Sequence, residues 1–96
     1  MALCYYWYPL KAEQNLRERD ISFTEGAGVL KYDPLSLTRP DHEHSEFDDE
    51  RFVTIGRSLR SRTLIVVHSD TVNGCTRIIS VREATSRERY AYERDE

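Results

Sequence analysis

Cysteine, proline and glycine are all scarce in this chain. Its 96 residues include two cysteines, three prolines and four glycines. Cys4 and Cys75 are too few for a disulfide scaffold, and their distant placement gives no metal-ligand spacing. The overall composition excludes disordered, collagenous and repeat classes. At this length we expect one globular domain over residues 1–96, with any chemistry built on a single small core.

Signals for membrane insertion or export are also lacking. No stretch approaches the ~18 consecutive apolar residues that a spanning helix requires. Residues 1–10 are apolar and aromatic, but they have no basic start and no cleavage site, and they contain Pro9. Together with the low cysteine content, this pattern predicts a protein of the reducing cytoplasm with no membrane association.

An excess of positive charge is missing as well, because the formal net charge is −3. Such a total argues against nucleic-acid binding, which usually needs a surplus of Lys and Arg. The charges are unevenly distributed, however. Residues 1–50 carry five basic and eleven acidic side chains, whereas residues 51–94 carry nine basic and four acidic ones. The basic half is therefore a candidate for binding an anion, and the acidic half for binding a basic partner.

The first third of the chain predicts a short strand and two helices. The aromatic run at residues 5–8 fits a strand, and Pro9 ends it and favours the first turn of a helix over residues 11–19. Ser22 and Glu25 have the spacing of a capping box, which predicts a second helix running to about Leu30. Asp33-Pro34 then ends this helix.

The remainder predicts four strands and a final helix. Residues 35–38 suit an edge strand, followed by strands at 51–57, 63–68 and 76–82. The continuous apolar run at residues 63–68 predicts a central strand buried on both faces. Asn73-Gly74 favours a hairpin, and Thr85 and Glu88 form a second capping box. The expected fold is α+β, with a central antiparallel β-sheet and helices largely on one side.

Arginines and a histidine in these strands are candidates for phosphodiester chemistry. Attack of an RNA 2′-hydroxyl needs a base, an acid and cationic donors for the charge that develops on phosphorus. Arg77 suits the cationic role, and His68 or Glu88 the proton transfers. Arg77 should lie near the His68 end of its partner strand, and it should face away from Arg82 unless a bulge intervenes. These residues could equally be solvated or structural strand ends.

A segment rich in His and acidic residues spans positions 41–50. His42 and His44 with nearby carboxylates could hold a divalent metal that activates water. A solvated loop and a docking surface for a basic partner are the other readings of the same composition. The spacing does not decide among them.

The order of motifs resembles the BrnT family over nearly the whole chain. The matching residues are Trp7-x-Pro9, Lys11, Asn15, Ile21-Ser22-Phe23, Asp33-Pro34, Asp41, His44-Ser45-Glu46, Glu50-Arg51, Thr54-Ile55-Gly56, Arg62 to His68, Arg77 to Arg82, and Ala84-Thr85 to Tyr92. The resemblance implies a bacterial type II toxin with a RelE-like fold, two N-terminal helices and one C-terminal helix. It also implies metal-independent RNA cleavage without a cofactor. A ribbon-helix-helix antitoxin, BrnA, would neutralise the toxin, and operator DNA would be bound only through that antitoxin.

Carried over by position, the resemblance implies a site made of Arg62 and Arg77, with Glu50, His68 and Arg82 as further candidates. Two departures from the family pattern stand out, one at a helix cap and one that bears on activity.

Tyr8 replaces an aspartate before the proline, which removes a helix cap worth typically ~1 kcal/mol. Glu18-Arg19-Asp20 replaces Lys-His-Gly, which removes a titrating base and a favoured helix end. An attenuated protein that only pairs with its antitoxin and regulates the operon is therefore the alternative function.

Overall fold

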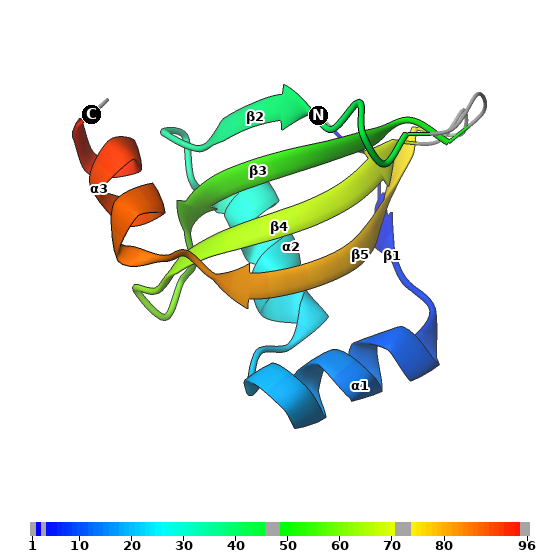
Figure 1. Ribbon diagram of the computed structural model, residues 1–96. Helices are drawn as coiled ribbons and strands as arrows, with labels where there is room; N and C mark the ends of the chain where they lie inside the picture. Colours follow the sequence, from blue (N-terminus) through cyan, green and yellow to red (C-terminus); the bar gives the residue numbers. More distant parts are fainter. Residues whose placement is uncertain (1, 3, 46–48, 71–73, 95–96) are drawn as a thin grey trace.

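The computed structural model describes residues 2, 4–45, 49–70 and 74–94, which form a five-stranded sheet and three helices. The elements are β1 (Cys4–Tyr6), α1 (Pro9–Arg19), α2 (Phe23–Tyr32), β2 (Leu37–Pro40), β3 (Arg51–Arg57), β4 (Thr63–Asp70), β5 (Cys75–Glu83) and α3 (Ser86–Arg94) (Figure 1). This is the order that the sequence predicts. No helix among the described residues is long and apolar enough to cross a membrane.

The sheet has the order β1-β5-β4-β3-β2. Strands β2 to β5 pair antiparallel, as expected, but β1 joins the edge of β5 in parallel, so the sheet is mixed. The apolar run in β4 does mark the central strand. Asn73 of the predicted hairpin turn lies outside the described residues, while Gly74 has a left-handed backbone with φ 82°.

Helix α2 covers one face of the sheet, α1 lies along the β5 edge beside it, and α3 lies at the end of the other face. In Figure 1, α2 lies behind the sheet and packs with α1 against a core that includes Phe23, Val29 and Leu64. The opposite face, which we call the open face, presents alternate residues of β2 to β5. These are Leu37, Arg39, Arg51, Val53, Ile55, Ile65, Val67, Ser69, Arg77 and Arg82. Because α3 reaches this face, the expectation of helices largely on one side holds only for α1 and α2.

A β-bulge in β5 changes which face of the sheet the side chains on either side of it lie on. Val67 of β4 pairs with Ser80, whereas His68 pairs with Ile78, so Ile79 has no partner on β4. The extra residue shifts the alternation by one. Ile78 and Val81 both enter the core as a result, and Arg77 and Arg82 both lie on the open face.

Buried Asn15 fastens α1 to the edge of β5 beyond the point where β1 ends. Its carboxamide nitrogen donates to the carbonyls of Val81 (2.9 Å) and Ile21 (3.0 Å), and its oxygen accepts from the Val81 amide (3.2 Å). The side chain thus replaces a neighbouring strand at Val81. Without it, both backbone groups of Val81 would be buried with no partner, at a cost of about 1–3 kcal/mol each.

A disulfide between Cys4 and Cys75 joins β1 to β5, a pairing that the cysteine spacing did not predict. The two residues are register partners in the parallel ladder, with 4.6 Å between their Cα atoms. Cross-linking residues 71 apart removes unfolded-state entropy worth up to ~4 kcal/mol in the chain-entropy model. Disulfides are uncommon in reducing compartments, so this bridge lends no support to a cytoplasmic location. That location stays a prediction.

The capping box at Thr85 and Glu88 forms in full, whereas the one at Ser22 forms by half, because the Glu25 carboxylate binds Arg62 and Ser58 instead of the Ser22 amide. The two departures at α1 also have visible consequences. Ser22 accepts from the Glu25 amide at 3.0 Å, while Thr85 and Glu88 exchange bonds at 3.2 and 2.8 Å. At the start of α1, Tyr8 makes no capping bond through its side chain. At the end of α1, Asp20 occupies the left-handed region with φ 58°.

Replacing Asp20 by glycine should stabilise the protein. The left-handed conformation costs an L-residue roughly 1–2 kcal/mol, less for Asp, and glycine adopts it freely. Asp20→Gly should therefore raise the free energy of unfolding by about 0.5–1 kcal/mol, as measured by urea denaturation. Asp20→Ala is the control and should give no gain, because alanine keeps the steric conflict. A glycine variant no more stable than wild type would contradict this account.

Candidate active site on the open sheet face

Five polar side chains meet where β4 ends and β5 begins, and we call them the Arg77 cluster: Tyr8, Asp49, Arg51, Ser69 and Arg77. Arg77 Nη2 donates to Asp49 Oδ2 at 3.1 Å, and Nη1 donates to the Tyr8 hydroxyl at 2.8 Å. The Tyr8 ring lies against the guanidinium, 5.1 Å from its centroid to Cζ. Ser69 donates to Asp49 Oδ1 at 2.5 Å, and Arg51 Nε lies 3.8 Å from Asp49 Oδ2.

Strand register explains why these residues converge. Arg51 pairs with Ser69 and Ser69 pairs with Arg77, so the three lie in one row across β3, β4 and β5. On the far side of β5, Tyr6 pairs with Arg77, which brings Tyr8 close two residues later. The cluster therefore depends on pairing between segments far apart in the chain.

The Arg77 cluster contains one carboxylate, that of Asp49, and more hydrogen-bond donors than this carboxylate accepts from. The bond from Ser69, together with the charges of Arg77 and Arg51, lowers the pKa of Asp49, so this group is ionised at neutral pH. The Nε atoms of Arg51 and Arg77 are both buried and have no hydrogen-bond partner among the described residues. Unpaired buried donors are uncommon in proteins and favour an anionic ligand.

Arg62 lies apart from this cluster, on the side of the sheet that α2 covers. Its guanidinium binds both carboxylate oxygens of Glu25 in the first turn of α2, and it also donates to the Asp20 carbonyl at 3.3 Å. Glu25 is only 5% exposed, and this pairing lowers its pKa. Here Arg62 joins the β3–β4 loop to the helices, and the structure does not bring it together with Arg77.

Arg82 shares the open face with Arg77, because of the bulge, but is held by Glu88. Two hydrogen bonds of 2.8 and 2.9 Å join the guanidinium to the carboxylate. Glu88 also accepts from the Thr85 amide in the capping box. These bonds, chiefly those from Arg82, lower the Glu88 pKa to about 2. Glu88 is therefore ionised at neutral pH, and its carboxylate is bound to Arg82 and the Thr85 amide.

His68 is buried on the helix-covered side and does not share a surface with Arg77. Its Nε2 forms a 2.7 Å hydrogen bond with the Thr54 hydroxyl, and its ring stacks on Phe52. Burial lowers the His68 pKa, so the ring is neutral at pH 7. Its buried Nδ1 makes no hydrogen bond to any described residue and lies 3.8 Å from Asp70 Oδ1.

Of the acidic residues at positions 41–50, Asp49 joins the Arg77 cluster and Glu50 does not. Glu50 is exposed and makes no hydrogen bond or ion pair with any residue that the structure describes. His44 pairs with Asp41 at 2.9 Å, and His42 is exposed. Within residues 4–45, 49–70 and 74–94, no three His, Cys, Asp or Glu side chains are grouped to hold a metal ion. Glu46 and Asp48 of this segment lie outside the described residues.

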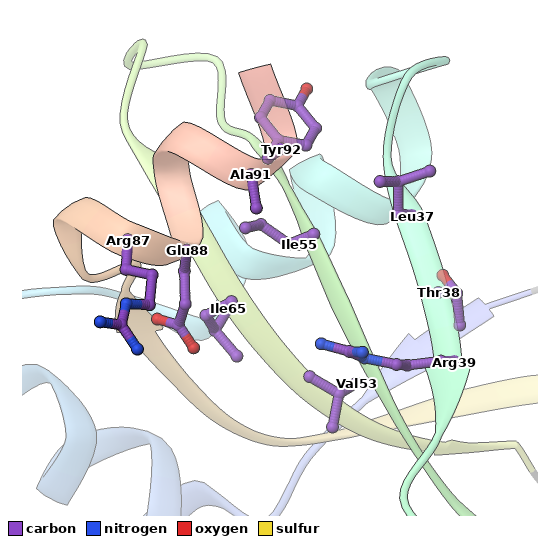
Figure 2. A pocket seen from close by; sticks show the side chains of 10 residues that line it. All are labelled: Leu37, Thr38, Arg39, Val53, Ile55, Ile65, Arg87, Glu88, Ala91 and Tyr92. Atoms are coloured by element: carbon purple, nitrogen blue, oxygen red, sulfur yellow. The ribbon is translucent and has the colours of Figure 1, made fainter. Parts of the chain in front are cut away.

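A groove of about 440 Å³ runs along the open face between α3 and β2. Figure 2 shows its floor of Val53, Ile55 and Ile65, with the Arg39 side chain extending from β2 over Val53. Arg87 lies at the opposite rim. The open face thus combines the polar Arg77 cluster at one end with an apolar, basic-rimmed groove at the other.

Sequence reasoning missed four members of the cluster: Tyr8, Asp49, Arg51 and Ser69. Asp49 and Arg51 flank Glu50, so the right segment was identified, and strand alternation would have placed Arg51 and Val53 on one face. Nothing local indicates that Tyr8 reaches Arg77, because that contact depends on the parallel pairing of β1.

Fold and cluster together define a small α+β protein with arginines on the open face of its sheet. Comparison with known families makes this specific: the model for the ribonuclease toxin BrnT of type II toxin–antitoxin systems matches residues 7–88. The chain belongs to the BrnT family, as its motifs indicate.

A solved structure supports the fold. The chain is similar to the crystal structure of the Brucella abortus ribonuclease toxin BrnT, with a TM-score of 0.67 and 17% identity. The match covers 86% of this chain and 99% of that one. At this level of identity the likeness shows the shared fold. A comparison with curated proteins finds no match.

The Arg82–Glu88 pair should make stability depend on pH in acid. Because the folded-state pKa of Glu88 is about 2, below its ordinary value of 4.5, the stabilisation is complete above the ordinary value and is lost as the pH falls toward 2. Glu88→Gln should therefore be less stable than wild type at pH 7, and the difference should shrink by pH 2. Glu93→Gln on the same helix, where the contact with Arg57 is exposed and 3.5 Å long, serves as the control. A difference that stays constant with pH would disprove this role.

Proposed function

We propose that this chain is an endoribonuclease toxin that cleaves RNA without a metal ion, at the Arg77 cluster. The observation that carries the proposal is the pair of buried Nε donors of Arg51 and Arg77, which lie on either side of one carboxylate and have no hydrogen-bond partner in the part of the chain that the structure describes. An arginine fork matches the geometry of a phosphate. Membership of the ribonuclease toxin family supports RNA as the source of that phosphate.

In the proposed reaction the ribose 2′-oxygen forms a bond to phosphorus and the bond to the 5′-oxygen breaks. The leaving 5′-oxygen takes a proton from water, so the products are a cyclic phosphate and a free 5′-hydroxyl. Arg77, assisted by Arg51, stabilises the extra negative charge on the phosphoryl oxygens in the transition state. Entry of the phosphate draws Arg77 away from Asp49, which raises the Asp49 pKa and makes this carboxylate a better acceptor for the 2′-hydroxyl proton.

This mechanism changes the weight given to the residues nominated from the sequence. Arg77 remains central, and Arg82 lies on the same face as a further contact for the RNA backbone. Arg62, bound to Glu25, and His68, buried on the other side, support the fold. Glu50 gives way to its neighbour Asp49 as the acidic member of the site, and Asp49 takes the role of candidate base in place of His68 or Glu88.

For partners, we propose a BrnA-like ribbon-helix-helix antitoxin, through which alone operator DNA would be bound, and a cytoplasmic location. The support is family membership in a type II toxin–antitoxin system. The open face has room for such a partner, since α3 covers only one end of it.

Purified protein should cleave single-stranded RNA in the presence of EDTA. Arg77→Ala should slow cleavage by at least about 100-fold, because it removes a donor aimed at the transition-state charge. Arg60→Ala, which deletes an equal charge from the exposed β3–β4 loop, should cleave at the wild-type rate. Gel analysis of end-labelled RNA gives both rates. Cleavage by Arg77→Ala at the wild-type rate would disprove this site, and activity abolished by EDTA would disprove metal independence.

A second candidate function is an attenuated binding protein, and one observation favours it. Each of the three nominated arginines is held by a carboxylate of the same chain: Arg62 by Glu25, Arg77 by Asp49 and Arg82 by Glu88. An attenuated protein would retain the antitoxin partner and lose RNA cleavage.

Expression of the chain alone in a bacterial host separates the two functions. The active toxin should arrest growth, and Arg77→Ala should relieve the arrest at equal expression. Growth that is unaffected by the wild-type chain, with soluble protein confirmed on a gel, would favour the binding protein.

A further inference from the structure

Tyr8 contacts Arg77 in two ways. Its hydroxyl accepts a hydrogen bond from Nη1 at 2.8 Å, and its ring lies 5.1 Å from the guanidinium carbon. Arg77 itself is only 17% exposed. Tyr8 and Asp49 thus hold the guanidinium at its two Nη atoms.

The fold gives little reason for a tyrosine at this position. The ring is 55% exposed, so it contributes little to the core. The backbone has the extended conformation of a helix N-cap, where Ser, Thr, Asp or Asn would satisfy a free amide, and Tyr8 does not. Among the described residues, the hydrogen bond and ring contact of the Tyr8 side chain are both with Arg77.

We infer that Tyr8 is a positioning residue for Arg77 in the cleavage reaction, an inference that rests on the proposed function. Substrate phosphate must replace Asp49, because two anions compete for one fork. Tyr8 is a neutral acceptor and does not compete, so it stays bound to Nη1 after Asp49 has left. It then keeps the guanidinium plane oriented toward the phosphate, where an unsupported arginine would sample many rotamers.

The hydroxyl and the ring can be separated by substitution. Tyr8→Phe keeps the ring and should lower kcat by about fivefold through loss of one hydrogen bond to a charged group. Tyr8→Ala also loses the cation–π contact and should lower kcat by roughly 20-fold. The KM should change by less than about twofold, because the support matters most when charge builds on the phosphate. Tyr32→Phe, an exposed tyrosine on α2, is the matched control and should leave both constants unchanged.

A double-mutant cycle with Arg77→Lys distinguishes positioning from a purely structural role. Lysine keeps a positive charge but has no Nη1 to bind, so Tyr8→Phe should have no further effect in that background. A structural role would lower kcat equally in both backgrounds. Thermal unfolding of each variant, which should match wild type within a few degrees for Tyr8→Phe, accounts for any loss of folded protein.

Each outcome bears on a different claim. If wild type cleaves RNA and Tyr8→Phe cleaves equally fast, the inference about Tyr8 is overturned while the proposed function stands. An equal loss in both Arg77 backgrounds also overturns it. If the folded wild-type protein cleaves no RNA, the proposed function fails, and Tyr8 has no reaction to serve.

Discussion

The one-residue bulge at Ile79 is the constraint on which the rest of the molecule depends. Side chains alternate strictly along a regular strand, so residues three apart cannot both enter the core. In β5, Ile78 and Val81 do so, and Arg77 and Arg82, five apart, both emerge on the open face. The same bulge therefore places both apolar residues in the core and both arginines on the open face. Bulges commonly redirect side chains next to active sites.

The distribution of charge in space differs from its distribution in sequence. The first half of the chain is acidic and the second half basic, which suggested separate surfaces for two partners. In the fold, Glu25 and Asp49 of the acidic half bind Arg62 and Arg77 of the basic half. Part of the segregation is thus neutralised within the molecule. Under the proposed function, an RNA phosphate would replace an internal carboxylate on its arginine, and binding should weaken as salt screens both interactions.

Much of the fold could be predicted from the sequence because its signals are local. Capping boxes at Ser22 and Thr85, Pro9 at the start of α1 and the apolar run of β4 each define an element without reference to the rest of the chain. The site could be predicted only in part, because its geometry is not local. Arg77 was nominated as a candidate from its residue type and motif. Its partners Tyr8 and Asp49 come from segments 69 and 28 residues away, and they meet it only through the parallel pairing of β1 and the register of β3 to β5.

The disulfide between Cys4 and Cys75 turns most of the chain into a covalent ring. The ring contains α1, α2 and strands β2 to β4, and most of β5 together with α3 follows it as a tail. A single backbone cut in any loop within the ring would leave both fragments attached to each other. As long as the disulfide is intact, Tyr8 could not diffuse away from Arg77 after such a cut, because the bridged Cys4 and Cys75 lie shortly before Tyr8 and Arg77 in the chain. The two residues that form the centre of the proposed site are thus connected by a short path through sulfur as well as by the long path through the backbone.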